Sequence, residues 1–113
     1  MSKLSRVYVA SIDTGVMTSA GDYPSGGSGV YLPANARVLR ATLTETTTIA
    51  GLTNIKLVTG STDLTGTLGL SDIDAHEPLT LTSFVGAGEL KLTTTGTASG
   101  GSRANIHVEY VLE

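Results

Sequence analysis

The sequence predicts an all-β fold, a single β-sandwich or jelly-roll-like barrel of about seven or eight antiparallel strands with little or no helix. Several short runs alternate apolar and polar residues, which is the period of a half-buried strand. Charged residues make up only 15% of the chain, against about 25% in an average domain, and Thr and Gly take their place. Thr favours extended backbone and Gly favours turns. The 113 residues fit one domain, 1–113, with one core.

The first third of the chain predicts one strand, a long loop and a second, short strand. Residues 6–12 form a compact β-favouring run that ends at a turn, and residues 1–5 before it are expected to be a flexible arm. Residues 13–29 contain too many Gly, Ser and Pro for regular structure and are expected to form a long loop. Residues 30–32 are extended, and Pro33 ends them because it has no amide to donate.

The middle of the chain predicts two longer strands. Residues 37–47 alternate, with Leu39, Ala41 and Leu43 on one face. A break at 50–51 separates them from a strand over 53–59, and a turn follows at 60–63. The stretch 64–78 has no clear period, although a short helical turn is expected around 71–76.

The last third predicts a β-hairpin and a final strand. Alternating runs over 79–84 and 89–94 flank a short Gly-bearing link at 85–88, a pattern typical of a hairpin. A flexible loop over 96–102 leads to the strand 103–112. The expected core consists of the apolar residues on the inner faces: Val7, Val9, Leu39, Ala41, Leu43, Ile55, Leu57, Leu79, Leu81, Leu90, Leu92, Ile106, Val108 and Tyr110.

Charge and composition exclude several classes of partner. A net charge of −3 argues against nucleic acid, whose phosphates require clustered Lys and Arg. No stretch reaches the roughly 20 apolar residues that cross a bilayer, so no membrane partner is expected and the chain is expected to be made in a host cytoplasm. The absence of Cys removes disulfides and thiolate metal sites.

Catalytic and metal-binding patterns are incomplete. Residues Asp72 to Glu77 include His76 and three carboxylates, but neither calcium nor zinc spacing is completed, so a solvated acidic loop is favoured over a cation site. His107 and Glu109 share one face of a strand, so their geometry allows a His–carboxylate pair, but there is no nucleophile elbow and no third group, and an exposed cross-strand polar pair is favoured. The sequence therefore predicts no enzyme, no catalytic residues, no metal and no cofactor.

Association with another protein is the remaining function. The N-terminal residues Lys3, Leu4 and Arg6, and the loop pair Tyr23-Pro24, place apolar, aromatic or basic groups where a terminus or a loop contacts another chain. We expect these five residues to bind a partner. The alternative is that Tyr23 only pins its own loop.

The run from Val30 to Ala41 carries a family resemblance. Its Leu-Pro-Ala-x-Ala-x-Val corner, followed by a Thr-rich strand and a Gly-rich β half, resembles tailed-bacteriophage head decoration (cement) proteins or related small β-sandwich virion proteins. The resemblance implies a domain that trimerises on the capsid lattice. It assigns no functional residue.

The resulting hypothesis is a non-enzymatic virion structural protein that binds the outer surface of a phage capsid as a homotrimer and stabilises it. Its partners would be the major capsid protein and other copies of itself. The alternative is a fibre or tail-tip module that binds host surface glycan or protein. A small hydrolase that uses His76 or His107 is the least favoured reading.

Overall fold

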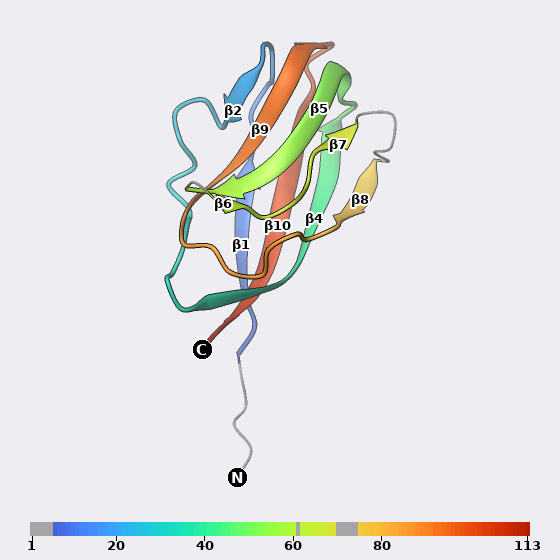
Figure 1. Cartoon of the computed structure of the whole chain (residues 1–113). Helices are drawn as coiled ribbons and strands as arrows, with labels where there is room; N and C mark the ends of the chain where they lie inside the picture. Colours follow the sequence, from blue (N-terminus) through green and yellow to red (C-terminus); the bar gives the residue numbers. More distant parts are fainter. Residues whose placement is uncertain (1–5, 61, 70–74) are drawn as a thin grey trace.

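The chain folds as two antiparallel β-sheets that pack face to face (Figure 1). The structure is a computed structural model that describes residues 6–60, 62–69 and 75–113. Within these ranges it contains ten strands and no helix. The predicted all-β sandwich is confirmed.

One sheet has four strands and follows the order β1-β10-β4-β8. Its members are β1 (Tyr8–Asp13), β10 (Arg103–Leu112), β4 (Ala36–Thr47) and β8 (His76–Leu79). The start of β1 therefore lies beside the end of β10, because the two strands pair antiparallel from Tyr8–Tyr110 to Asp13–Asn105. Predicted strands at 6–12, 37–47 and 103–112 correspond to β1, β4 and β10.

The other sheet is built around the long pair β5 (Ala50–Thr59) and β9 (Gly88–Ser99). Short strands extend it on both sides: β2 (Gly21–Tyr23) and β3 (Tyr31–Leu32) pair with β9, and β6 (Thr62–Asp63) and β7 (Leu68–Gly69) pair with β5. The central strands of this sheet, β5 and β9, are long, whereas its border strands have only two or three residues.

One hydrophobic core fills the space between the sheets. Nine of the predicted core residues are buried in it: Ala41, Leu43, Ile55, Leu57, Leu79, Leu90, Leu92, Ile106 and Val108. Leu81 and Tyr110 are half-buried and pack against it. The alternating pattern therefore identified the inner faces of the long strands correctly.

The prediction that Val7 and Val9 belong to the core is wrong. Both side chains are more than half exposed, at 52% and 58%, while Ala10 and Ile12 point inward. Residues 7–12 are apolar on both faces, so alternation alone fits two opposite orientations of this strand. Val9 lies opposite Glu109 on the outer face of the four-stranded sheet.

Leu39 is also outside the core, because β4 contains a β-bulge. Arg40 lies opposite Glu109 but Val38 lies opposite Tyr110, so Leu39 is an extra residue on β4. A bulge of this kind reverses the inside–outside alternation of the strand. Val38 is consequently 1% exposed and Leu39 is 46% exposed, the reverse of the predicted faces.

The predicted hairpin over 79–94 is wrong. Leu79 ends β8, which pairs with β4, whereas β9 pairs with β5 in the opposite sheet. Residues 80–87 therefore cross from one sheet to the other (Figure 1). A short Gly-bearing link between two alternating runs fits both a hairpin within one sheet and a crossing between two sheets. Which of the two forms depends on the distant strand with which each run pairs.

Three further segments differ from expectation. The stretch 13–29 contains β2 and buries Met17, whose amide donates to Ser102 O at 2.8 Å. Gly96 lies within β9 rather than in a loop. Of the predicted helical turn at 71–76, residues 71–74 lie outside the described part of the chain, and His76 begins a strand, so the prediction is wrong there.

Candidate partner-binding surface

Both histidines of the chain lie on the outer face of the four-stranded sheet. Each is held by a hydroxyl of the neighbouring strand: His107 Nδ1 lies 2.7 Å from Ser11 Oγ, and His76 Nδ1 lies 2.8 Å from Thr44 Oγ1. They line a shallow hollow of about 410 Å³ together with Val9, Arg40, Thr42 and Glu109. Both histidines are exposed, so water reaches each imidazole.

The predicted pair between His107 and Glu109 does not form. The Glu109 carboxylate instead accepts hydrogen bonds from Arg40 Nε and, at 3.2 Å, from Arg40 Nη2. His107 therefore has a serine partner but no carboxylate to orient it, as a catalytic triad requires. The hollow is a polar part of a sheet surface.

The acidic stretch from Asp72 to Glu77 lies only partly within the described residues. Asp72 and Asp74 lie outside the described residues, and His76 and Glu77 project to opposite faces of β8 because they are consecutive strand residues. Over 6–60, 62–69 and 75–113, no three His, Cys, Asp or Glu side chains are grouped to hold a metal ion.

Of the five predicted partner-binding residues, the structure describes three, and these lie in two separate segments of the chain. Lys3 and Leu4 lie outside the described residues, and Arg6 is exposed just before β1. Pro24 is half-buried after β2. The structure does not bring Arg6 and Pro24 onto one element, and their binding role stays a prediction.

Tyr23 is 6% exposed and pins its own loop, which is the second of the two roles considered for it. Its hydroxyl accepts from the amides of Thr18 and Ser19, both at 3.1 Å, and donates to Ser19 O at 2.6 Å. The amide of Thr18, followed by that of Ser19, holds the pKa of the Tyr23 hydroxyl below its usual value of 10.0. The ring is therefore part of the core and is not an accessible contact.

Three segments that carry exposed apolar side chains lie at the end of the sandwich where the C-terminus is: the start of β4, the 80–87 crossing and the end of β10 (Figure 1). This apolar end consists of Leu39, Phe84, Val85 and Leu112, which are 46%, 51%, 57% and 40% exposed. Val38 N donates to Phe84 O at 2.7 Å, which places the 80–87 crossing beside the bulge of β4, and Leu112 lies opposite Ala36 at the start of the same strand.

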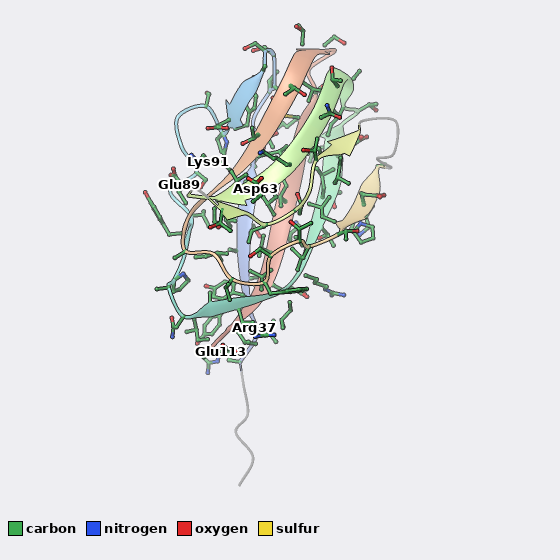
Figure 2. The ribbon with its side chains drawn as sticks, in the orientation of Figure 1. Arg37, Asp63, Glu89, Lys91 and Glu113 are labelled. Carbon is green, nitrogen blue, oxygen red and sulfur yellow. The ribbon has the colours of Figure 1, made fainter. Side chains whose placement is uncertain are left out.

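A charged rim borders the apolar end. Arg37 and Glu113 lie side by side there in Figure 2, with 3.6 Å between Arg37 Nη1 and Glu113 Oε1. The Glu113 amide also donates to Asn35 O at 2.9 Å, which fixes the C-terminal residue against the 33–36 corner. Apolar side chains inside a polar rim are the usual anatomy of a protein interface.

The opposite end has a different chemistry. It is formed by the turns at 46–49 and 99–102 and by the 14–20 segment, in which the exposed residues are mainly Thr, Ser and Gly, with Val16 as an exposed apolar exception. The outer face of the six-stranded sheet is likewise polar, with Lys56 and Lys91 paired to Asp63 and Asp22. Among the described residues, four of the eight exposed large apolar side chains thus belong to the apolar end.

Sequence reasoning missed this surface. Leu39 was assigned to the core, and Phe84 and Val85 to a hairpin. One signal was present: Phe84-Val85 are consecutive large apolar residues followed directly by Gly86-Ala87-Gly88. Large apolar residues in a segment that lacks a strand period have no inner face to occupy.

Among the described residues, the structure contains no helix long and apolar enough to span a membrane.

Comparisons with known proteins show the fold. No protein-family model matches the sequence, and no curated protein matches it. A chain of the capsid asymmetric unit of cyanophage Pam1 is 18% identical over 100% of this chain and 89% of its own, with a TM-score of 0.63. A chain of the acidic stable capsid structure of Helicobacter pylori bacteriophage KHP30 is 16% identical over 98% of this chain and 92% of its own, with a TM-score of 0.68. This chain therefore shares a whole-chain β-sandwich with proteins found in two phage capsid structures.

Proposed function

We propose that the chain is a non-enzymatic virion structural protein that binds the outer surface of a phage capsid and stabilises it. The observation that carries the proposal is the match of essentially the whole chain, in both directions, to chains from two phage capsid structures. A full-length match means that the similarity covers the complete β-sandwich and not one motif within it. The position of the exposed apolar groups supports the proposal independently.

The apolar end is the surface proposed to contact the major capsid protein. Full burial of a large apolar side chain contributes about 1.5–3 kcal/mol. The four side chains of this end are roughly half exposed, so together they have about 3–6 kcal/mol left to gain. For one copy this free-energy gain is modest once the entropic cost of association is subtracted. A shell presents the same site many times, so the gain is repeated at every occupied site.

Stabilisation follows from linkage. A protein that binds the assembled shell and not its separated subunits shifts the equilibrium towards the shell, by an amount that grows with its concentration relative to the dissociation constant. No chemistry at His76 or His107 is required for this role. Arg6 and Pro24 remain proposed contacts. The family resemblance implies a trimer, and the mass of the chain in solution decides between a trimer and any other oligomer.

Co-sedimentation tests the proposal. Purified chain is mixed with shells assembled from the major capsid protein of the same genome, and the bound chain is measured in the pellet. Wild type is expected to saturate the shells and to raise their melting temperature. The double variant Phe84→Ser/Val85→Ser is expected to bind at least tenfold more weakly, because it removes two of the four apolar contacts.

Val16→Ser is the matched control. Val16 is 56% exposed, close to the 51% of Phe84 and the 57% of Val85, but it lies at the opposite end of the sandwich. Its replacement is expected to leave shell binding unchanged. Failure of the wild type to pellet with shells would refute the proposed function, and equal weakening by Val16→Ser would refute the assignment of the apolar end.

A further inference from the structure

Strand β1 is an open sheet edge. It pairs with β10 on one side, and no described strand pairs with its other side. It is six residues long, whereas the other border strands have two to four residues. β1 also lacks the usual devices that block edge pairing, namely Pro, Lys or a bulge, while β8 at the other border of this sheet carries Pro78.

The hydrogen-bonding direction along β1 identifies the free groups. Thr14 N donates to Ala104 O at 2.9 Å, and antiparallel residues alternate between bonded and non-bonded pairs. Tyr8, Ala10 and Ile12 therefore face β10 with their backbone groups. The amides and carbonyls of the alternate residues Val7, Val9 and Ser11 point away from β10, towards the free edge.

The side chains on this edge are apolar and uncharged where a partner strand would lie. Val7 and Val9 are 52% and 58% exposed on the outer face, and no charged residue stands between Val7 and Ile12. Arg6 precedes this stretch and Asp13 ends it. Antiparallel pairing of two identical edges brings Arg6 of one copy towards the Asp13–Arg103 ion pair of the other, whereas parallel pairing would place the two Arg6 side chains next to each other.

We propose that β1 pairs antiparallel with β1 of a second copy, so that two four-stranded sheets join into one continuous sheet. Identical antiparallel strands are related by a two-fold axis, and the same surface serves both copies. The register centred on Val9 pairs Val9 with Val9 of the partner subunit and Val7 with Ser11 of the partner subunit. A register centred on Ala10 would instead place Val7 opposite Asp13 of the partner subunit.

This inference identifies the self-association surface of the proposed virion protein, and it predicts a dimer rather than the trimer implied by the family resemblance. The contact is one strand wide, smaller than a standard interface of about 800 Å² per partner. The dimer is therefore expected to be weak in solution. The edge residues Val7, Val9 and Ser11 are different residues from the four of the apolar end, although β1 begins beside the end of β10 that carries Leu112.

Amide hydrogen exchange across a concentration series, read residue by residue, tests the pairing directly. The amides of Tyr8, Ala10 and Ile12 are expected to be protected at every concentration. Those of Val9 and Ser11 are expected to become protected only as the dimer forms, with sedimentation velocity reporting a mass of two chains. A monomer at all concentrations, a trimer, or a dimer in which Val9 and Ser11 still exchange freely would overturn the proposal.

Val9→Lys is the matching variant, because it adds a charge at the proposed two-fold axis, where two copies would meet as like charges. It is expected to weaken dimerisation at least tenfold. The control Thr95→Lys places the same charge at an exposed position of β9, in the other sheet, and is expected to dimerise as wild type does. Equal dimerisation by Val9→Lys and wild type would also overturn the proposal. Shell binding by the wild type is measured separately, so failure of this pairing and failure of the proposed function are distinguishable.

Discussion

Replacing Tyr23 by Phe removes one buried hydroxyl and leaves the ring in the core. The hydroxyl accepts from two amides at 3.1 Å and donates to Ser19 O at 2.6 Å, so three backbone groups lose their partner. A buried polar group left without a partner costs about 1–3 kcal/mol. Thr18 and Ser19 are exposed, so water reaches part of the gap, and we expect a total loss of about 1–3 kcal/mol rather than three times that value.

Thermal and urea unfolding measure this loss. At roughly 4 °C per kcal/mol for a domain of this size, the melting temperature of Tyr23→Phe should fall by about 4–12 °C. Tyr31→Phe is the control, because Tyr31 is 62% exposed, so water solvates its hydroxyl in the folded protein. Equal stability of wild type and Tyr23→Phe would refute the conclusion that this hydroxyl anchors the 18–23 segment.

Three other changes test the fold. Gly51→Ala should destabilise the protein by about 2 kcal/mol or more, because Gly51 has φ +84° and a Cβ there would lie 2.3 Å from Thr97 O. The control Gly26→Ala should be near neutral, because there is open space around the Gly26 Cα. Equal urea midpoints for the two variants would contradict the argument. Leu57→Ala, at a fully buried position, should lower the free energy of unfolding by about 2–5 kcal/mol, and a smaller loss would mean that the two sheets are less tightly packed than described. Arg103, and then the Gly15 amide, hold the pKa of Asp13 below 3.8, so the ionised carboxylate stabilises the fold above pH 3.8 and this contribution is lost as the pH falls through the lowered pKa. Asp13→Asn should therefore be less stable than wild type near neutral pH, and the difference in free energy of unfolding should shrink in acid. A difference in free energy that does not change with pH would be the contrary result.

The sequence predicts strands well because alternation is a local property. The long strands β4, β5 and β10 were all expected from residues that lie within one run, and their inner faces were mostly correct. Pairing between strands is not local. Consecutive strands β4 and β5 belong to different sheets, as do β8 and β9, and neither fact is visible in the connecting residues.

Two kinds of residue escaped prediction for identifiable reasons. The bulge at Leu39 depends on the register with β10, so nothing in the β4 sequence announces that the alternation reverses there. Met17 stands in a segment of turn residues, yet it is 1% exposed because the 14–20 segment packs against the ends of β9 and β10, through hydrogen bonds from Met17 N to Ser102 O and from Ala98 N to Thr18 O. A single apolar residue among breakers gives no period to detect.

The candidate surface was harder to predict than the fold. Leu39, Phe84 and Leu112 come together from three separate parts of the chain. The sequence predicts Leu39 in the core, Phe84 in a hairpin and Leu112 only as the end of the last strand. The β1 edge was missed for a different reason: Val9 was expected to be buried, and a strand is recognised as an edge only when the order of the whole sheet is known.

Electron cryomicroscopy of the virion tests the central claim most directly. We expect density for this β-sandwich on the outer surface of the capsid, with Phe84 and Val85 against the major capsid protein. Density for the sandwich in the tail or its fibres, inside the shell, or absent from the virion would contradict the proposed function.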